Sequence, residues 1–100
     1  MDKNCYLLSD EQVLELVTDF KALGEVGRLK IVLCLLCGKK SVGEISNIVG
    51  LSQSATSHQL RILKDARILR ANKRGTVNVY EIADDHVKTI IEKSVEHLDC

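Results

Sequence analysis

The chain has 100 residues, a formal net charge of zero, 45% hydrophobic residues and no proline. These values fit one small globular domain and exclude a disordered segment. The longest apolar run, from Ile31 to Cys37, is too short to span a bilayer, and no signal peptide is recognisable. We therefore expect a cytoplasmic protein that does not bind membranes and whose 4 cysteines stay mainly reduced.

The charges are distributed unevenly along the chain. Between Leu51 and Tyr80, six basic residues accompany a single acidic residue, whereas residues 81–100 contain six acidic residues and two lysines. A basic stretch attracts phosphate-rich partners, and an acidic stretch that contains histidines suits cations. This asymmetry indicates a nucleic-acid-binding middle and a cation-binding C-terminal part.

Residues 1–8 are expected to form a short N-terminal arm. Ser9 and Gln12 predict a capping box at the start of a first helix, which Gly24 ends. A second helix is predicted from about Glu25 to Cys37, because its leucines and valines recur at helical spacing.

Cys34 and Cys37 lie three residues apart on this second helix, a spacing that can place two thiols on one face. A cysteine among leucines and valines is more often a small core residue. We therefore expect Cys34 in the core and Cys37 nearer the surface. Whether Cys5 joins them in an accessory thiolate site stays open.

Residues 41–66 are predicted to form two helices joined by a tight turn at Gly50, the helix-turn-helix pattern. Ser41 and Glu44 predict a capping box for the shorter helix, and the longer one runs from about Gln53 to Ala66. The longer helix has a polar stripe whose donors and acceptors suit base edges in a major groove. An ordinary solvated face is the alternative, but such faces usually carry more glutamate and lysine. The candidate DNA-binding residues are Gln53, Ser54, Thr56, Ser57, His58 and Arg61.

β-Branched residues on both sides of Gly75 predict a β-hairpin over residues 69–82. Lys73 and Arg74 at its turn are candidates for phosphate contacts beside the groove. The expected fold is therefore mainly α with a small β-hairpin, a single winged helix-turn-helix domain over residues 1–100.

The last predicted helix, residues 84–100, carries potential metal ligands at both ends. Asp84 and His86 begin it, and His97 and Cys100 end it. The two histidines lie roughly 16 Å apart along a helix axis, whereas zinc–ligand bonds are only about 2.0–2.3 Å long. An antiparallel helix of a second copy would bring opposite ends together and make two equivalent sites in a dimer. Solvated polar residues on a surface helix are the alternative.

The rotation along this helix agrees with a shared site. At 100° per residue, His97 and Cys100 each lie within about 40° of His86 around the helix axis, so the three residues share one face. Two imidazoles, the Asp84 carboxylate and a thiolate make a tetrahedral zinc site. The thiolate also favours cadmium or copper(I) over nickel or cobalt.

Three segments together resemble the ArsR/SmtB family of bacterial winged-helix repressors: Ala22–Ile31, Ser41–Ile45 and Leu51–Leu60. The resemblance covers the chain from about Val13 to Cys100. It implies a homodimer with the first and last helices at the interface, which binds double-stranded operator DNA. By the same resemblance, DNA contacts are implied for Gln53, Ser54, Ser57, His58, Lys73 and Arg74.

The resemblance also indicates which metal the protein senses. The zinc-type branch of the family carries Asp-x-His and then His-x-x-His or His-x-x-Glu on its last helix. Here Asp84 and His86 are followed after ten residues by His97 and Cys100. Only the last ligand differs from the family pattern, because Cys100 stands in place of histidine or glutamate. The Cys-x-Cys pair of the arsenic, cadmium and lead branch is missing from residues 41–44. The resemblance therefore implies a repressor that zinc releases from DNA.

Two other functions are alternatives. Some members of the family sense reactive sulfur or oxidants with one cysteine on the second helix and one on the last, the positions of Cys34 and Cys100 here. An enzyme or a metal-storage protein is the third hypothesis. No nucleophile–base set and no phosphate-binding glycine loop is recognisable, so we expect neither catalysis nor a small organic substrate.

Overall fold

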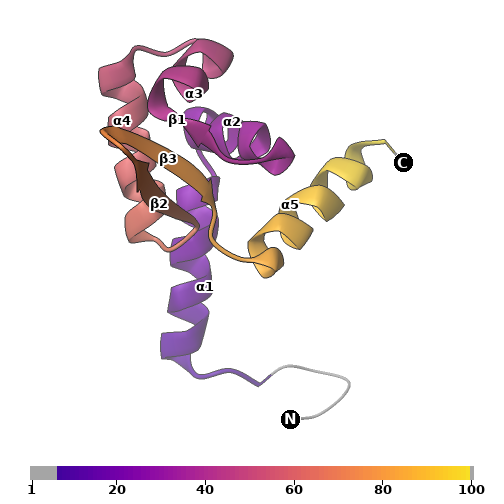
Figure 1. Ribbon diagram of the computed structural model, residues 1–100. Helices are drawn as coiled ribbons and strands as arrows, with labels where there is room; N and C mark the ends of the chain where they lie inside the picture. Colours follow the sequence, from indigo (N-terminus) through magenta and orange to yellow (C-terminus); the bar gives the residue numbers. More distant parts are fainter. Residues whose placement is uncertain (1–6, 100) are drawn as a thin grey trace.

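The structure, a computed structural model, describes residues 7–99 (Figure 1). Cys5, Cys100 and most of the expected N-terminal arm lie outside these residues. The elements in chain order are α1 (Asp10–Leu23), α2 (Val26–Cys34), the 3-10 helix η1 (Leu35–Cys37), β1 (Lys40–Ser41), α3 (Val42–Val49), α4 (Gln53–Asp65), β2 (Leu69–Arg74), β3 (Val77–Ile82) and α5 (Asp85–Leu98). The helix-turn-helix followed by a hairpin is confirmed.

Both predicted capping boxes are present. The Ser9 hydroxyl accepts the Gln12 N–H at 3.1 Å, and the Gln12 side chain accepts the Ser9 N–H at 3.0 Å. Ser41 and Glu44 make the same pair of bonds at 3.2 and 2.9 Å. The second predicted helical segment does end at Cys37 with Gly38 as its C-cap, but only α2, up to Cys34, is α-helical, and the last turn is the 3-10 helix η1.

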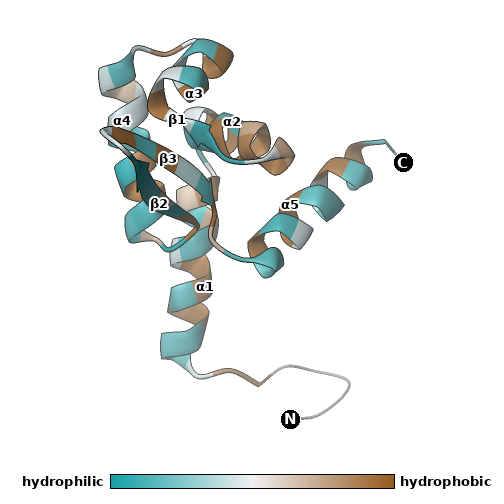
Figure 2. Ribbon diagram, in the orientation of Figure 1, coloured by the Kyte–Doolittle hydropathy of each residue, from teal (hydrophilic) through white to brown (hydrophobic). Residues whose placement is uncertain are grey.

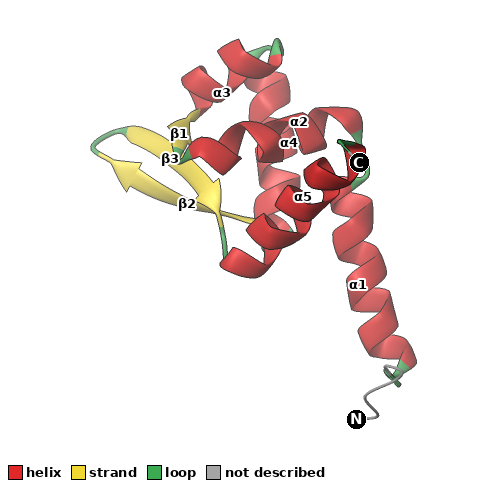
Figure 3. Ribbon diagram, turned by 90° about the vertical axis from the view of Figure 1, so that its right-hand side faces the viewer, coloured by secondary structure: helices red, strands yellow, loops and turns green. Residues whose placement is uncertain are grey.

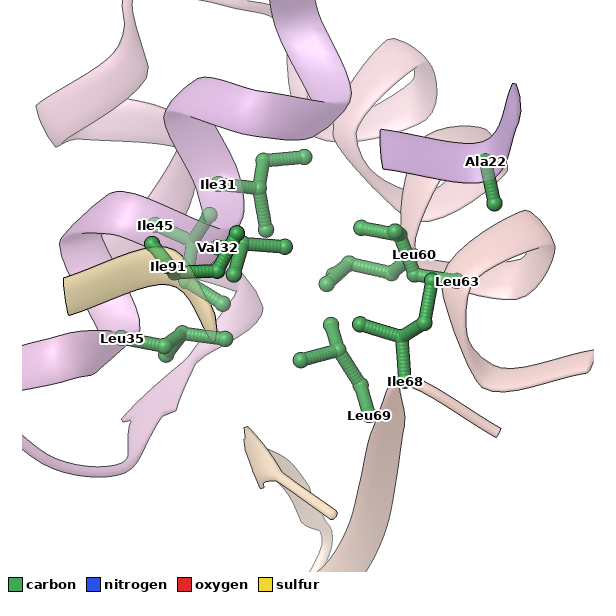
Figure 4. Packing of buried hydrophobic residues seen from close by; sticks show 10 residues of the cluster. All are labelled: Ala22, Ile31, Val32, Leu35, Ile45, Leu60, Leu63, Ile68, Leu69 and Ile91. Carbon is green, nitrogen blue, oxygen red and sulfur yellow. The ribbon is translucent and has the colours of Figure 1, made fainter. Parts of the chain in front are cut away.

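The hydrophobic core lies where α2, α3 and α4 meet, and α1, α5 and the start of β2 each add side chains to it (Figure 4). Its buried members are Ala22, Ile31, Val32, Leu35, Ile45, Leu60, Leu63, Ile68, Leu69 and Ile91. This core fixes α3 and α4 against α2, so the helix-turn-helix is a rigid unit.

The hairpin belongs to a three-stranded antiparallel sheet with strand order β1-β3-β2. Arg74 pairs with Val77, so the turn consists of Gly75 and Thr76, with Gly75 at φ +65°. The prediction that Lys73 and Arg74 lie in the turn was wrong, because both residues belong to the end of β2. Strand β1 was not predicted, since two residues carry too little pattern to indicate a strand.

Helix α1 extends away from the body of the domain (Figures 1 and 3), and α5 follows β3 at its edge (Figure 1). Both helices carry hydrophobic residues (Figure 2), many of which are exposed. The exposed apolar residues on these two helices are Val13, Leu14, Leu16, Val17, Phe20, Ile90, Val95 and Leu98. Phe20 is 59% exposed and Leu98 is 81% exposed. Apolar surface of this extent marks an interaction face.

Candidate nucleic-acid interface and metal site

Helix α4 has one buried face and one exposed face. The Ser52 hydroxyl caps it by accepting the Ala55 N–H at 3.0 Å. Leu60 and Leu63 lie in the core with no exposed surface. The opposite face is open to solvent and presents Gln53, Ser54, Ser57, His58 and Arg61. The predicted polar stripe is thus accessible along a single helix, as contact with a DNA groove requires.

Thr56 does not belong to that stripe, and its expected DNA contact is corrected here. Its side chain is fully buried, and its hydroxyl has no hydrogen-bond partner among residues 7–99. The sequence contained the signal, because Thr56, Leu60 and Leu63 are spaced i, i+4 and i+7 and therefore share the core face.

The wing presents Lys73 and Arg74 at the exposed end of β2. Nearer the body, Arg70 forms an ion pair with Glu81 across the two strands at 2.8 Å. The Arg70 hydrogen bond is the main cause that lowers the pKa of Glu81. Since Arg70 is engaged within the sheet, Lys73 and Arg74 are the wing's candidates for phosphate contacts.

The structure brings Asp84 and His86 together. The His86 ring is 96% exposed, with its Nδ1 atom 3.8 Å from the Asp84 carboxylate. Asp84 also caps α5, because its Oδ1 atom accepts the Val87 N–H at 3.0 Å. A carboxylate has two oxygens with about four lone-pair sites, so capping leaves acceptor capacity for a metal.

His97 lies in the last turn of α5, at the far end from His86. The helix has 14 residues, which corresponds to about 21 Å. Within residues 7–99, no three His, Cys, Asp or Glu side chains are grouped closely enough to hold a metal ion together. The described part of one chain thus contains three of the four expected ligands, with Asp84 and His86 at one end of α5 and His97 at the other.

The two described cysteines differ in exposure, as expected. Cys34 is half-buried against the core and lines a groove between α2 and α3, whereas Cys37 is exposed. Burial raises the pKa of the Cys34 thiol, and the positive charge of Lys40 opposes that shift. Cys34 is therefore less ionised than an ordinary thiol, which lowers its reactivity.

Sequence reasoning missed one polar cluster, formed by Glu25, Arg28 and Gln59, where α1, α2 and α4 meet. Gln59 is adjacent to His58 in sequence but is half-buried. Helical spacing separates the two faces of α4, yet it does not identify a partner 31 residues away.

Comparisons with known proteins agree with this geometry. Residues 25–71 match the family model described as bacterial regulatory protein, arsR family. A cadmium resistance transcriptional regulatory protein CadC homolog from Staphylococcus aureus is 35% identical over 91 residues, which is 90% of this chain and 75% of that protein.

Two solved structures share the fold. The antimony-specific transcriptional repressor AntR superposes with a TM-score of 0.85 and 31% identity, over 97% of this chain and 88% of that one. The homodimeric winged helix-turn-helix DNA-binding domain of Mb0332 from Mycobacterium bovis gives a TM-score of 0.83 and 26% identity, over 95% and 91%.

This chain belongs to the arsR family of bacterial regulatory proteins. It is a winged helix-turn-helix DNA-binding transcriptional regulator and not an enzyme. No helix in residues 7–99 is long and apolar enough to cross a membrane.

Proposed function

We propose that this protein is a metal-responsive repressor of the bacterial cytoplasm. A metal-free homodimer binds operator DNA, and zinc, cadmium or copper releases it by binding at two sites between the subunits. The ligands of each site are Asp84 and His86 of one copy with His97 and Cys100 of the other.

The separation of the described ligands along α5 is the observation that carries this proposal. Asp84 and His86 are adjacent, but His97 is about 16 Å away along the helix axis. The exposed apolar residues of α5 favour packing against another copy. Two antiparallel α5 helices would bring the start of each beside the end of the other.

Operator binding is supported by two exposed surfaces, the polar face of α4 and the basic end of the wing. In a symmetric dimer the two copies of α4 would meet half-sites about 34 Å apart. Ligands that tie together the α5 helices would restrict how the two domains sit on DNA. Metal and DNA binding would then oppose each other by about 1–3 kcal/mol, or roughly 5–150-fold in affinity.

A related cadmium resistance regulator and an antimony-specific repressor also support a metal or metalloid inducer. Two observations weigh against a thiol switch between Cys34 and Cys100. Burial raises the pKa of Cys34. In addition, Cys34 lines a groove with Ile48 and Val49 of α3 and is not among the residues that line the apolar groove beside α5.

The test measures the affinity of the reduced protein for a fluorescent operator fragment with and without saturating zinc. Wild type should bind at least about fivefold more weakly with zinc. His97→Ala should bind the metal-free operator normally and lose the zinc response. Glu92→Ala, another exposed position on α5, is the control and should keep the response. The same measurement is repeated with cadmium and copper(I), and an effect below about twofold in wild type with all three metals would refute the proposal.

A further inference from the structure

One arginine joins three helices at the centre of the domain. The Arg28 side chain, in the first turn of α2, is only 18% exposed. Its Nε and Nη2 atoms donate to the carbonyl oxygens of Ala22 and Lys21 in the last turn of α1, at 2.7 and 3.4 Å. Its Nη1 atom donates to Oε1 of Gln59 on α4 at 3.1 Å. A single planar guanidinium therefore links α1, α2 and α4.

Glu25 completes this network. Its carboxylate caps α2 by accepting the Arg28 N–H at 2.8 Å, a bond that is the main cause lowering the pKa of Glu25. The same carboxylate oxygen accepts Nε2 of Gln59 at 3.3 Å. The Gln59 amide is thus held at both ends, with its oxygen on Arg28 and its nitrogen on Glu25. This double restraint fixes the rotation of α4 at that point.

Gly27 lies against the network and leaves room for it. A Cβ atom at this position would be 3.2 Å from Oε2 of Glu25 and 3.4 Å from Nε2 of Gln59. Both distances are at or below ordinary van der Waals contact, so a larger residue would push on the two side chains that hold α4.

The network lies between two functional surfaces. Gln59 is next to His58 on the exposed face of α4, and α1 carries exposed apolar side chains that include Phe20. Apolar packing between helices is not directional, whereas hydrogen bonds specify both distance and angle. The network therefore adds directional restraints on the orientation of α4 relative to α1 to the packing of the core.

We propose that Glu25, Arg28 and Gln59 are positioning residues that set the angle between α4 and the dimerisation helix α1. Through that angle they determine the half-site spacing that the dimer accepts on DNA. The inference rests on the proposed function only in that a dimer bridges two half-sites, and it does not depend on metal.

The test uses an operator selected from random DNA with the metal-free wild-type protein. Affinities are then measured for this operator and for versions with one base pair added or removed between the half-sites. Wild type should lose about tenfold or more in affinity with each change. Gln59→Ala should lose at most about threefold, because a loosened α4 tolerates the altered spacing. Gly27→Ala should also reduce the difference in affinity between the selected operator and the versions with altered spacing.

Gln53→Ala is the matched control, since it removes the same side chain from the exposed face of α4 outside the network. It should weaken binding by the same factor at every spacing. A loss of folded protein would also act equally on every operator, so a smaller difference between operators separates positioning from stability. If Gln59→Ala lowers affinity uniformly, as Gln53→Ala does, the positioning role is refuted. If wild type binds the operator with the same affinity in the presence of metal, the proposed metal response is refuted. The dependence of affinity on half-site spacing would still test the positioning role.

Discussion

Asp84 and His86 lie side by side at the start of α5, with 3.8 Å between the aspartate Oδ1 and the histidine Nδ1 atoms. The same Asp84 oxygen accepts the backbone N–H of Val87 and caps the helix. Asp84 therefore combines a structural role, which needs an acceptor, with a proposed ligand role, which needs negative charge.

Two substitutions separate these roles of Asp84. Asparagine caps helices about as well as aspartate, so Asp84→Asn should change the free energy of unfolding by less than about 0.5 kcal/mol. It should weaken zinc binding by at least about tenfold, because even outer-shell changes at metal sites cost that much. Asp84→Ala should also lose about 1 kcal/mol of stability. Urea unfolding of metal-free protein and zinc titration against a chelator measure the two effects. Wild-type zinc affinity in Asp84→Asn would remove Asp84 from the ligand set.

Thr56 gives a second prediction, because its buried hydroxyl has no hydrogen-bond partner in the described part of the chain. Thr56→Val keeps the side-chain shape and removes the unpaired hydroxyl, so the free energy of unfolding should rise by about 1 kcal/mol. Operator affinity should stay unchanged, whereas Ser57→Ala on the exposed face should reduce it. Weaker DNA binding by a fully folded Thr56→Val protein would show that Thr56 contacts DNA after all.

Arg67 gives a third prediction. It follows α4 with φ +61°, a left-handed conformation that glycine adopts without steric cost. The Ile68 N–H bonds to the Leu63 carbonyl, and the Arg67 N–H bonds to the Lys64 carbonyl, which is the Schellman arrangement. Arg67→Gly should therefore raise the free energy of unfolding by about 1 kcal/mol in urea denaturation. Arg67→Ala keeps the strain and should give no such gain. A less stable glycine variant would mean that the arginine side chain contributes more than its backbone strain costs.

Local signals in the sequence predicted much of this fold. The capping boxes at Ser9 and Ser41 and the turn at Gly50 depend on neighbouring residues, so sequence spacing was sufficient to find them. Strand β1 was missed because its two residues become a strand only by pairing with β3. The left-handed Arg67 was missed because glycine is the usual residue at that position.

In the candidate site, too, local sequence spacing predicted some features, whereas contacts between residues far apart in sequence were missed. Periodicity on α4 predicted which polar side chains are exposed, except at Thr56, whose small polar side chain was assigned to the wrong face. The link between Arg28 and Gln59 joins residues far apart in sequence, and helical periodicity carries no information about such a contact. The distance between His86 and His97 followed from helix geometry alone.

Glu44 predicts how stability depends on pH. Hydrogen bonds from Ser41, chiefly from its backbone N–H, hold the pKa of Glu44 below its ordinary value of 4.5. A lowered folded-state pKa means that Glu44 contributes stability above pH 4.5, and that this contribution is lost as the pH falls through the folded-state pKa. Glu44→Gln keeps a capping box of the kind that Gln12 makes in α1 but carries no charge.

The difference in unfolding free energy between wild type and Glu44→Gln should therefore favour wild type at pH 7 and shrink as the pH falls below 4.5 and through the folded-state pKa. Urea unfolding across this pH range measures it. Glu92→Gln, an exposed substitution on α5, is the control for a general effect of charge removal. A difference for Glu44→Gln that stays constant with pH would contradict the assignment.

Mixed dimers test most directly whether each metal site takes its ligands from both copies of α5. In a heterodimer of one His86→Ala and one His97→Ala protomer, one site lacks both histidines and the other retains all its ligands. The heterodimer, purified through two different affinity tags, should bind one zinc ion tightly, whereas each variant homodimer should bind none tightly. A heterodimer without a tight zinc site would contradict the account.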